Sequence, residues 1–407
     1  MSLLTDISSE MLYPIIPLFL TGVLHAPMTA VGLIEGLAES TASLLKVLSG
    51  WYSDRLRRRR PFLFIGYGLS ALAKPLLALA TAWPLVLVAR FIDRAGKGVR
   101  SSPRDVLIAA SCDPEHRGKA FGLHRAMDTT GAIVGPVLAM VLLSRLKVGY
   151  STIFLLAFIP AALGVALLGF VPWEAAPATV AAPPAGREGG GAADDGPGSQ
   201  ESAAARVVSP ELRGLLVVVG VFALGNSSDV FLILKAKQVG LSAALVLGTY
   251  VLYNAVYALV ATPAGWLSDR LSRRALLGAG FVVFALVYVG FARAQHPWMI
   301  WPLFALYGCY AAATEGVVKA YVTDLSAPAT RGTALGLVQT VTGVMALAAS
   351  SIAGLLWSKV SPAAPFLWAA ACALLAAVLL VTLCGRGGRP GDALPAPDPP
   401  PAGAAPA

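Results

Sequence analysis

The sequence predicts an all-α membrane protein with about twelve transmembrane helices in two pseudo-symmetric six-helix halves. Composition is the first observation: 57% of the 407 residues are hydrophobic, 13% are charged, and the mean hydropathy is +0.71. Apolar segments of about 20 residues, the length that crosses a bilayer as a helix, recur along the chain. Only helices satisfy their own backbone in lipid at this length. A basic motif also occurs twice, once in each half.

Charged or turn-forming residues bound each apolar segment and set the limits of the expected helices. The N-terminal half is expected at 1–173 and the C-terminal half at 213–385. The segment 174–212 is rich in Ala, Pro, Gly and acidic residues, so we expect a disordered cytoplasmic linker, and the tail 386–407 has the same character. The expected spans are roughly 4–24, 28–50, 62–82, 84–104, 119–143, 152–172, 214–235, 241–264, 275–294, 298–322, 333–357 and 364–384.

Lysine and arginine set the expected orientation. If both termini are cytoplasmic, most of these residues, including the run from Arg55 to Arg60, fall on the cytoplasmic side, which satisfies the positive-inside rule. We therefore expect a multi-pass protein of the cell inner (plasma) membrane with both termini in the cytoplasm. The net charge of +9 reflects this topology, so no nucleic-acid partner is expected.

The start of the chain differs from the start of the second half. The segment ISSE at 7–10 matches NSSD at 226–229, but fewer apolar residues precede the first copy, and no Lys or Arg occurs before Lys46. We expect a first helix that is clipped, which an upstream start codon would explain. The alternative is a marginal first helix of about 20 residues that begins at Met1. Because the beginning of the sequence carries no positive charge, we expect no cleavable signal peptide.

No pattern in the sequence indicates a catalytic or metal centre. The cysteines lie in or beside apolar segments and lack the spacing of metal ligands. Since no Walker lysine motif or ATP-binding domain is present, uphill transport would draw on an ion or substrate gradient. We expect no cofactor, no metal, no enzymatic activity and a monomer. The four cysteines are Cys112, Cys309, Cys372 and Cys384.

The basic motif marks the same place in both halves. It reads GWYSDRLRRRR at 50–60 and GWLSDRLSRR at 265–274, each between two apolar segments. At such a turn the Asp can face the positive N-terminus of a helix while the arginines stay at the lipid headgroups. The motif resembles the loop 2–3 motif of the major facilitator superfamily and its weaker copy in loop 8–9, although Arg57 and Ser272 replace its second glycine. The resemblance implies a gating role for Gly50, Asp54, Arg55, Arg58, Gly265, Asp269, Arg270 and Arg273.

Two more motifs of the superfamily match expected helices. On the fifth helix, Gly122, Gly131, Gly135 and Pro136 have the spacing of the antiporter motif, in which glycines allow close helix approach and the proline bends the helix. On the fourth helix, RFIDRAG at 90–96 resembles a motif whose arginine is associated with proton coupling, and this role transfers only to Arg90. The resemblance covers the membrane part of the chain and implies a proton-coupled exporter whose cavity is lined by helices 1, 4, 7 and 10.

Charged residues inside apolar segments are the candidates for chemistry. One such charge at the bilayer centre costs about 2.5–3.5 kcal/mol, so it normally faces a cavity or a partner. On the fourth helix Asp93 cannot neutralise three cations alone, so carboxylates of other helices must contribute, either in a static ionic lock or as proton carriers. Asp93 leads the proton-coupling candidates because its protonation would release neighbouring cations. The proton-coupling candidates are Asp93, Glu39, Asp128 and Glu10, and the substrate-cavity candidates are Arg90, Arg94, Asp229, Glu315 and Lys319.

These observations predict a secondary transporter. We expect proton-coupled export of a small organic molecule, such as a drug, metabolite or siderophore-like compound, by alternating access between the halves. The small-molecule substrate, protons and the lipid bilayer are the expected partners. An importer or uniporter of an anionic metabolite is the alternative that the cationic fourth helix suggests. A non-transporting membrane receptor is the alternative from another class.

Overall fold

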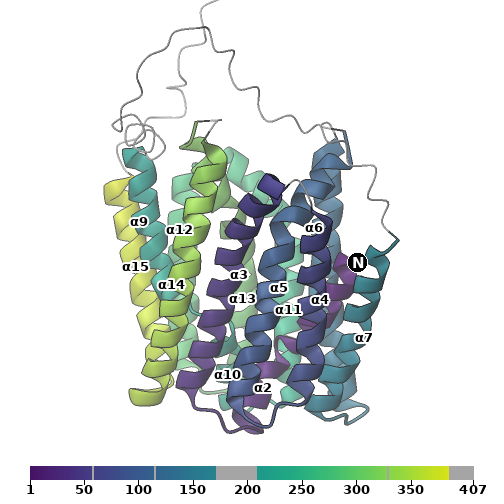
Figure 1. The fold of residues 1–407 in the computed structure, drawn as a ribbon. Coiled ribbons are helices and arrows are strands. Elements are labelled where there is room, and N and C mark those ends of the chain that lie inside the picture. The colour runs from purple at the N-terminus through teal and green to yellow at the C-terminus, as the bar shows by residue number, and fades with distance from the viewer. Residues whose placement is uncertain (57–58, 114–115, 171–208, 328–329, 385–407) are drawn as a thin grey trace, which may run out of the picture.

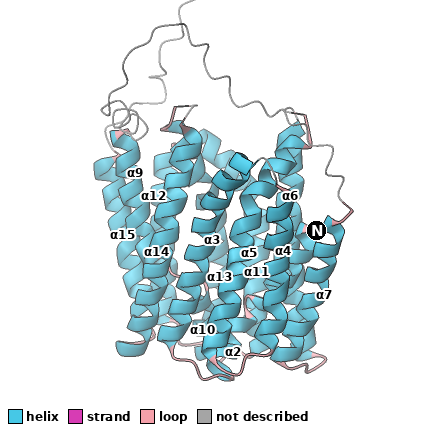
Figure 2. Ribbon diagram, viewed as in Figure 1, coloured by secondary structure: helices cyan, strands magenta, loops and turns pink. Residues whose placement is uncertain are grey.

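The described part of the chain is built from α-helices (Figures 1 and 2). The computed structural model describes residues 1–56, 59–113, 116–170, 209–327 and 330–384, and no strand occurs among them. This confirms the all-α prediction. The helices of the first half are α1 (Ser2–Leu12), α2 (Ile15–Gly22), α3 (Met28–Leu56), α4 (Arg60–Ala78), α5 (Trp83–Ala110), α6 (Arg117–Ser144) and α7 (Tyr150–Leu168).

The second half begins at Pro210, earlier than the expected start at 213. Ser209 caps α9 because its side chain accepts a hydrogen bond from the Leu212 N–H at 3.1 Å, and a proline fits the first helical turn. The rest of the expected linker, 174–208, and the expected tail, 386–407, lie outside the described residues. The helices are α9 (Pro210–Gly225), α10 (Val230–Gln238), α11 (Ala243–Arg270), α12 (Arg273–Arg293), α13 (Pro297–Asp324), α14 (Arg331–Lys359) and α15 (Ala364–Leu383).

The first helix pair of each half is one broken span. α1 and α2 are interrupted at Tyr13 and Pro14, where the proline cannot donate a backbone hydrogen bond, and α9 and α10 are separated by residues 226–229. When each pair is counted once, the described residues form twelve spans, as predicted. The matched segments 7–10 and 226–229 differ in structure, because 7–10 lies inside α1 and 226–229 forms the break.

The two halves repeat one packing scheme. In the first half α1 packs on α6 and α7, α3 on α5, and α4 on α5 and α7; in the second half α9 packs on α14 and α15, α11 on α13, and α12 on α13 and α15. The halves meet through α3 against α14 and α6 against α11, which are equivalent pairs under the same repeat. The predicted pseudo-symmetry of the fold is therefore confirmed.

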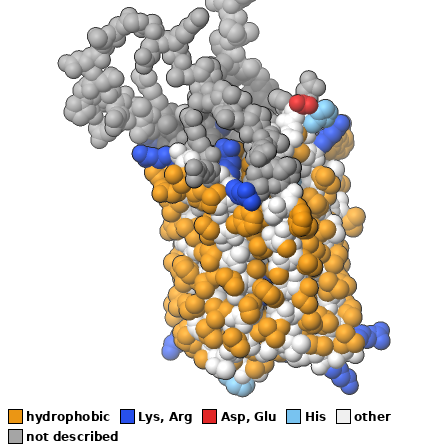
Figure 3. Space-filling view, turned by 45° about the vertical axis from the view of Figure 1, so that its right-hand side comes forward, with side chains coloured by type: hydrophobic (Ala, Val, Ile, Leu, Met, Phe, Trp, Pro, Cys, Tyr) orange, Lys and Arg blue, Asp and Glu red, His pale blue; other side chains and the backbone are white. Residues whose placement is uncertain are grey.

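Apolar side chains cover the sides of the bundle, and Lys and Arg gather at its ends on the face that Figure 3 shows. Nine spans in the described residues are long and apolar enough to cross a membrane by length and composition. The helices outside this set are α3, α5 and α13, and the first two carry most of the interior charges. A lipid-facing belt with charges at both ends is the arrangement that a bilayer favours.

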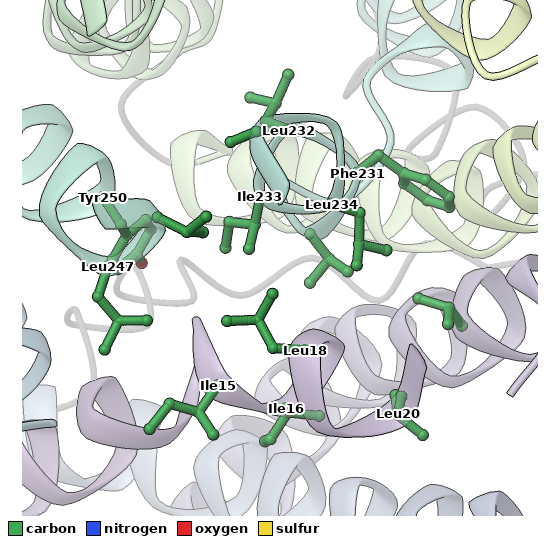
Figure 4. Packing of buried hydrophobic residues seen from close by; sticks show 14 of the residues in the cluster. Ile15, Ile16, Leu18, Leu20, Phe231, Leu232, Ile233, Leu234, Leu247 and Tyr250 are labelled. Atoms are coloured by element: carbon green, nitrogen blue, oxygen red, sulfur yellow. The ribbon is translucent and has the colours of Figure 1, made fainter. Parts of the chain in front are cut away.

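One end of the bundle, which we call the linker end, is the end at which α7 finishes and α9 begins (Figure 1). At the opposite end, α2 and α10 lie side by side and bury Ile15, Ile16 and Leu18 against Phe231 and Ile233 (Figure 4). Apolar side chains of both halves fill this end, and dispersion contacts hold it together. The bundle is therefore closed at the opposite end.

Small residues bring α3 and α14 close together over the part of these helices nearer the opposite end. A Cβ added to Gly36 would lie 2.9 Å from the Leu347 carbonyl oxygen, and one added to Gly343 would lie 2.5 Å from Ser43 Cβ. The Gln339 side chain donates to Ser43 Oγ at 3.3 Å. These contacts pack α3 tightly against α14 at the boundary between the halves. Lys46 of α3 lies beyond them, toward the linker end.

Candidate functional site

A cavity of about 350 Å³ lies between the two halves. On α3, α5, α6 and α13 the lining residues occupy the parts of the helices nearer the linker end. The lining is strongly polar, and both signs of charge are present. The lining residues are Asp6, Glu10, Lys46, Lys97, Arg100, Ser101, Arg104, Arg125, Asp128, Thr129, Ala132, Tyr253, Asn254, Tyr257 and Glu315.

The deepest ion pair joins α5 to α3. Arg90 donates to both carboxylate oxygens of Glu35, with N–O distances of 2.7, 2.8 and 3.1 Å, and the residues are only 3% and 1% exposed. Ser228, in the α9–α10 break, also donates to Glu35 at 3.3 Å. The guanidinium and the serine hydroxyl together satisfy both oxygens of the buried carboxylate. The hydroxyl also connects the α9–α10 break of the second half to the first half.

One turn along α5, Arg94 approaches Glu39 of α3 at 3.5 Å. The spacing explains the double pairing, because residues four apart share a helix face, and Glu35 and Glu39 match Arg90 and Arg94. Both guanidinium groups also lie 5.8 Å from the ring centroid of Tyr13. The two arginines are thus held between α3 and the aromatic ring at the break of the first span.

Asp93 points to a different neighbour. Lys74 of α4 donates to Asp93 Oδ1 at 2.6 Å, and Lys74 is 1% exposed. Asp93 is also buried and is not one of the residues that line the cavity. Its short contact with a buried ammonium makes it part of an interior ion pair between α4 and α5.

Two carboxylates are held by tyrosine hydroxyls instead of cations. Tyr250 of α11 donates to Glu10 of α1 at 3.1 Å, and Tyr307 of α13 donates to Asp229 at 2.6 Å. Within the described ranges neither carboxylate has a Lys or Arg nitrogen within 4.0 Å. The Glu10 bond crosses between the halves and its carboxylate lines the cavity, whereas Asp229 lies in the α9–α10 break, away from the lining.

The remaining predicted residues lie nearer the linker end. Asp128 of α6 lies 3.3 Å from His124 and accepts from Ser2 at 3.0 Å, and the same hydroxyl lies 3.2 Å from Asp6. Across the cavity, Glu315 accepts from Tyr257 at 2.5 Å and pairs with Arg125 at 3.3 Å and Lys319 at 3.8 Å. Arg125 also donates to Tyr257, so this group links α6 to α11 and α13.

The structure brings together some of the predicted partners and adds others. Among the proton-coupling candidates on other helices, Glu39 reaches Arg94 of α5, whereas Glu10 and Asp128 bond elsewhere. The partners missing from the prediction are Glu35 and Lys74. The shared four-residue spacing of Glu35/Glu39 and Arg90/Arg94 was a signal that could have found the first of them.

The repeated basic motif is built differently in the two halves. A Cβ on Gly50 would lie 2.6 Å from Ser102 Oγ of α5, whereas one on Gly265 would meet nothing within 4 Å among the described residues. In both copies an arginine stacks on the tryptophan one turn earlier, Arg55 on Trp51 and Arg270 on Trp266. Arg273 pairs with Asp324 at 2.5 Å, while the side chains of Asp54 and Asp269 and all of Arg58 lie outside the description.

The antiporter-like glycines of α6 face α1. A Cβ on Gly131 would lie 2.8 Å from Asp6 Cβ, and one on Gly135 would lie 2.7 Å from the Ile7 carbonyl oxygen. Gly122 has open space around it, with no described atom within 4 Å of its added Cβ, and Pro136 lies inside α6. Two of the glycines therefore set the close approach that places Asp6 and Glu10 at the cavity.

No metal centre is formed by the described residues. They contain no group of three or more His, Cys, Asp or Glu side chains that could hold a metal ion, and the four cysteines are free thiols. The charged and hydroxyl side chains of the site can bind a ligand, form ion pairs and exchange protons at carboxylates.

Comparison with known proteins identifies the family. A model described as Major Facilitator Superfamily matches residues 1–252 and 214–406. The chain belongs to the major facilitator superfamily. An uncharacterised MFS-type transporter of Methanocaldococcus jannaschii is 36% identical over 390 residues, which cover 93% of this chain and 92% of that protein. This superfamily member is therefore a multi-pass membrane transporter, and the receptor alternative is set aside.

Two more distant similarities add detail to the comparison. The multidrug resistance protein MdtH of Photorhabdus laumondii is 27% identical over 142 residues, 35% of each chain. A crystal structure of a mutant peptide transporter has a TM-score of 0.74 and 15% identity, and the match covers 94% of this chain and 92% of that one. The second similarity shows a shared fold alone.

Proposed function

We propose that this transporter exports a small organic molecule by proton-coupled alternating access and that Glu10 carries the proton. The observation behind this proposal is the position of Glu10: its carboxylate lines the cavity, lacks a Lys or Arg partner within 4.0 Å in the described residues, and bonds to Tyr250 of the other half. A proton site needs access to water and a protonation state that affects the contact between the halves. Glu10 meets both conditions.

The ion pairs of α5 are less suited to proton exchange. Protonating Asp93 would leave the buried ammonium of Lys74 unpaired, and protonating Glu35 would do the same to the Arg90 guanidinium. Removing one partner of a buried pair is strongly unfavourable, by about 3–5 kcal/mol. The geometry therefore favours the static ionic lock for these pairs and moves Glu10 ahead of Asp93, Glu39 and Asp128 as the coupling residue.

Protonation of Glu10 would weaken the bond that Tyr250 donates. Hydrogen bonds to a charged acceptor are roughly twice as strong as bonds between neutral groups. The deprotonated, empty carrier is thus held in the form described here, closed at the opposite end. The protonated carrier loses part of this bond and exchanges more readily between the two access states. Because the deprotonated carrier changes its access state less readily, the empty carrier does not change that state without a proton.

The position of the cavity, combined with the charge distribution, supports export. Lys and Arg are concentrated in the connections at the linker end, so the positive-inside rule places this end in the cytoplasm. The cavity then receives its substrate from the cytoplasm, as an exporter requires. The partial similarity to a multidrug resistance protein agrees with export.

A transport assay with purified protein tests the proposal. A screen of metabolites and drugs by thermal shift supplies a substrate, and uptake into proteoliposomes is driven by an imposed pH gradient. Glu10→Gln should insert normally and bind substrate but lose at least tenfold of the gradient-driven uptake. Asp128→Asn, a carboxylate of the same cavity, should keep most of it. Full pH-driven uptake by Glu10→Gln, or loss confined to Asp128→Asn, would contradict the assignment of Glu10.

Import or uniport of an anionic metabolite is the second candidate function. Its anionic substrate is favoured by two lysines of the cavity wall, Lys46 and Lys97, whose ammonium groups have no hydrogen-bond or ion-pair partner in the described part of the chain. The same vesicles separate the two functions. An exporter uses the proton gradient to accumulate substrate on the side of the membrane away from the linker end. A uniporter only equalises the substrate concentrations on the two sides, and the pH does not affect it.

A further inference from the structure

The cavity wall formed by α3 and α5 carries two cations. Neither of them is in direct contact with a carboxylate of the described residues. Lys46 of α3 and Lys97 of α5 line the cavity and are exposed to it, and neither ammonium group has a hydrogen bond or ion pair with a described residue. The other basic residues of the lining are engaged. Arg100 donates to Ser70, Arg104 pairs with Asp105, and Arg125 pairs with Glu315.

The surroundings of Lys46 are cationic. The positive charges that act on it are those of Lys97, Arg104 and Lys319, of which Arg104 is already held by Asp105 at 3.0 Å and Lys319 by Glu315 at 3.8 Å. Lys319 comes from α13 of the second half. Two like charges about 8 Å apart repel by roughly 2 kcal/mol at an effective dielectric constant of 20. A protein cavity that gathers such charges is complementary to an anion.

We propose that the two unpartnered lysines of the cavity wall, Lys46 and Lys97, bind the anionic group of the transported molecule, which is therefore a small organic anion. This inference rests on the proposed transport function and names its substrate class. The cavity of about 350 Å³ suits a small metabolite rather than a large drug.

The opposite wall offers polar contacts for the body of the anion. Tyr253 and Asn254 of α11 line the cavity, and Asn254 uses its amide N–H on the Tyr250 carbonyl oxygen at 3.0 Å, which leaves its side-chain oxygen as an acceptor. The Tyr253 ring stacks on Tyr307 at 5.3 Å and is held in place. The carboxylates of Asp6, Glu10 and Asp128 lie on α1 and α6, so the proton site and the anion site share one cavity but occupy different walls.

The bound anion would also favour closure at the linker end. Closure would remove water from Lys46 and Lys97, and without a ligand these unpartnered cations repel one another. An anion between them offsets the repulsion, so the loaded carrier closes more easily than the empty one. The substrate would therefore promote the conformational step that exports it.

Charge-selective labelling tests the site without a known substrate. Ser101 lines the cavity one turn after Lys97, so Ser101→Cys, in a background where the four native cysteines are replaced, reports on the local potential. Two methanethiosulfonate reagents of similar size are compared, the anionic sulfonatoethyl and the cationic trimethylammonioethyl compound, each relative to its rate with 2-mercaptoethanol. The anionic reagent should be favoured, and Lys46→Gln with Lys97→Gln should lower its relative preference about tenfold.

Two control variants make the result decisive. Lys46→Arg with Lys97→Arg keeps the charge and should keep the preference, and Lys237→Gln, at the opposite end of the bundle, should not change it. Equal or faster labelling by the cationic reagent, or a preference that survives the glutamine substitutions, would overturn the anion site. Because the assay involves no transport or pH gradient, this failure is distinct from failure of the proton-coupled export proposal.

Discussion

The three hydrogen bonds between Arg90 and Glu35 show how single residues determine the interior of the bundle. Almost no water reaches these charges, and they are tolerated because both carboxylate oxygens and the guanidinium are engaged in the pair. Glu10 is in the opposite situation, since it lines a cavity and is held by one hydroxyl. A cation partner in the interior marks the structural carboxylates, whereas a place in the cavity wall without a Lys or Arg partner marks the candidate for proton exchange.

Glu35→Gln should destabilise the protein by about 3–5 kcal/mol, because it leaves the Arg90 charge buried without its partner. The measurement is thermal unfolding in detergent. The double variant Glu35→Gln with Arg90→Gln should recover part of the loss, since the uncompensated charge is removed. Glu315→Gln, whose side chain is 47% exposed, is the matched control and should have a much smaller effect. Equal destabilisation by Glu35→Gln and Glu315→Gln would contradict this account.

Sequence reasoning found the charged residues of the site but only part of their pairing. Asp93, Arg90 and Arg94 could be recognised because charges inside apolar segments are conspicuous. Their partners depend on how each helix is rotated about its axis, and a span with polar residues on several faces does not fix that rotation. The bond from Tyr250 to Glu10 joins residues 240 positions apart, and no local pattern reveals such a contact.

At the scale of the helices, glycine positions decide how closely α6 approaches α1. Gly131 and Gly135 are in direct contact with the α1 backbone or its Cβ atoms, whereas Gly122 of the same motif is not. The spacing of the motif predicted close packing against a neighbour, and the structure identifies that neighbour as α1. The helix breaks were harder to predict, because segments 7–10 and 226–229 resemble each other in sequence but only the second interrupts its helix.

Gly135→Ala should lower stability by about 1–3 kcal/mol, because the added methyl group would lie 2.7 Å from the Ile7 carbonyl oxygen and force α6 away from α1. Gly122→Ala is the matched control, and it should be neutral or slightly stabilising since alanine favours the helix and no described atom obstructs it. Thermal unfolding of both variants in detergent gives the comparison. A loss at Gly122→Ala as large as the loss at Gly135→Ala would show that the glycines do not act through packing on α1.

At the scale of the whole molecule, two halves of the same packing scheme meet along α3 and α14 and along α6 and α11. The lengths of the hydrophobic segments were sufficient to predict the spans and their grouping, because a segment of this length can cross a bilayer only as a helix. The access state could not be predicted from the sequence. It depends on small differences in packing at the two ends, and here the opposite end is filled by apolar side chains while the cavity lies toward the linker end.

Deleting residues 180–205 should leave transport intact. The chain that remains between residues 170 and 209 still reaches up to about 40 Å when extended, and its Ala, Pro and Gly composition indicates a tether without a packed core. Uptake by correctly inserted protein is the measurement. Loss of uptake despite normal insertion would show that the segment contributes more than reach.

The most direct test of the account measures both ends of the bundle as pH changes. Spin labels at Leu48 and Leu271 report on the linker end, and labels at Leu146 and Val360 report on the opposite end. The side chains at all four positions are exposed. Between pH 8 and pH 5.5, double electron–electron resonance should show the linker-end distance shortening and the opposite-end distance lengthening in part of the population. In Glu10→Gln both distributions should stay the same at either pH, because the titrating group is gone. An unchanged wild-type pH response in Glu10→Gln would contradict the claim that protonation of Glu10 controls alternating access.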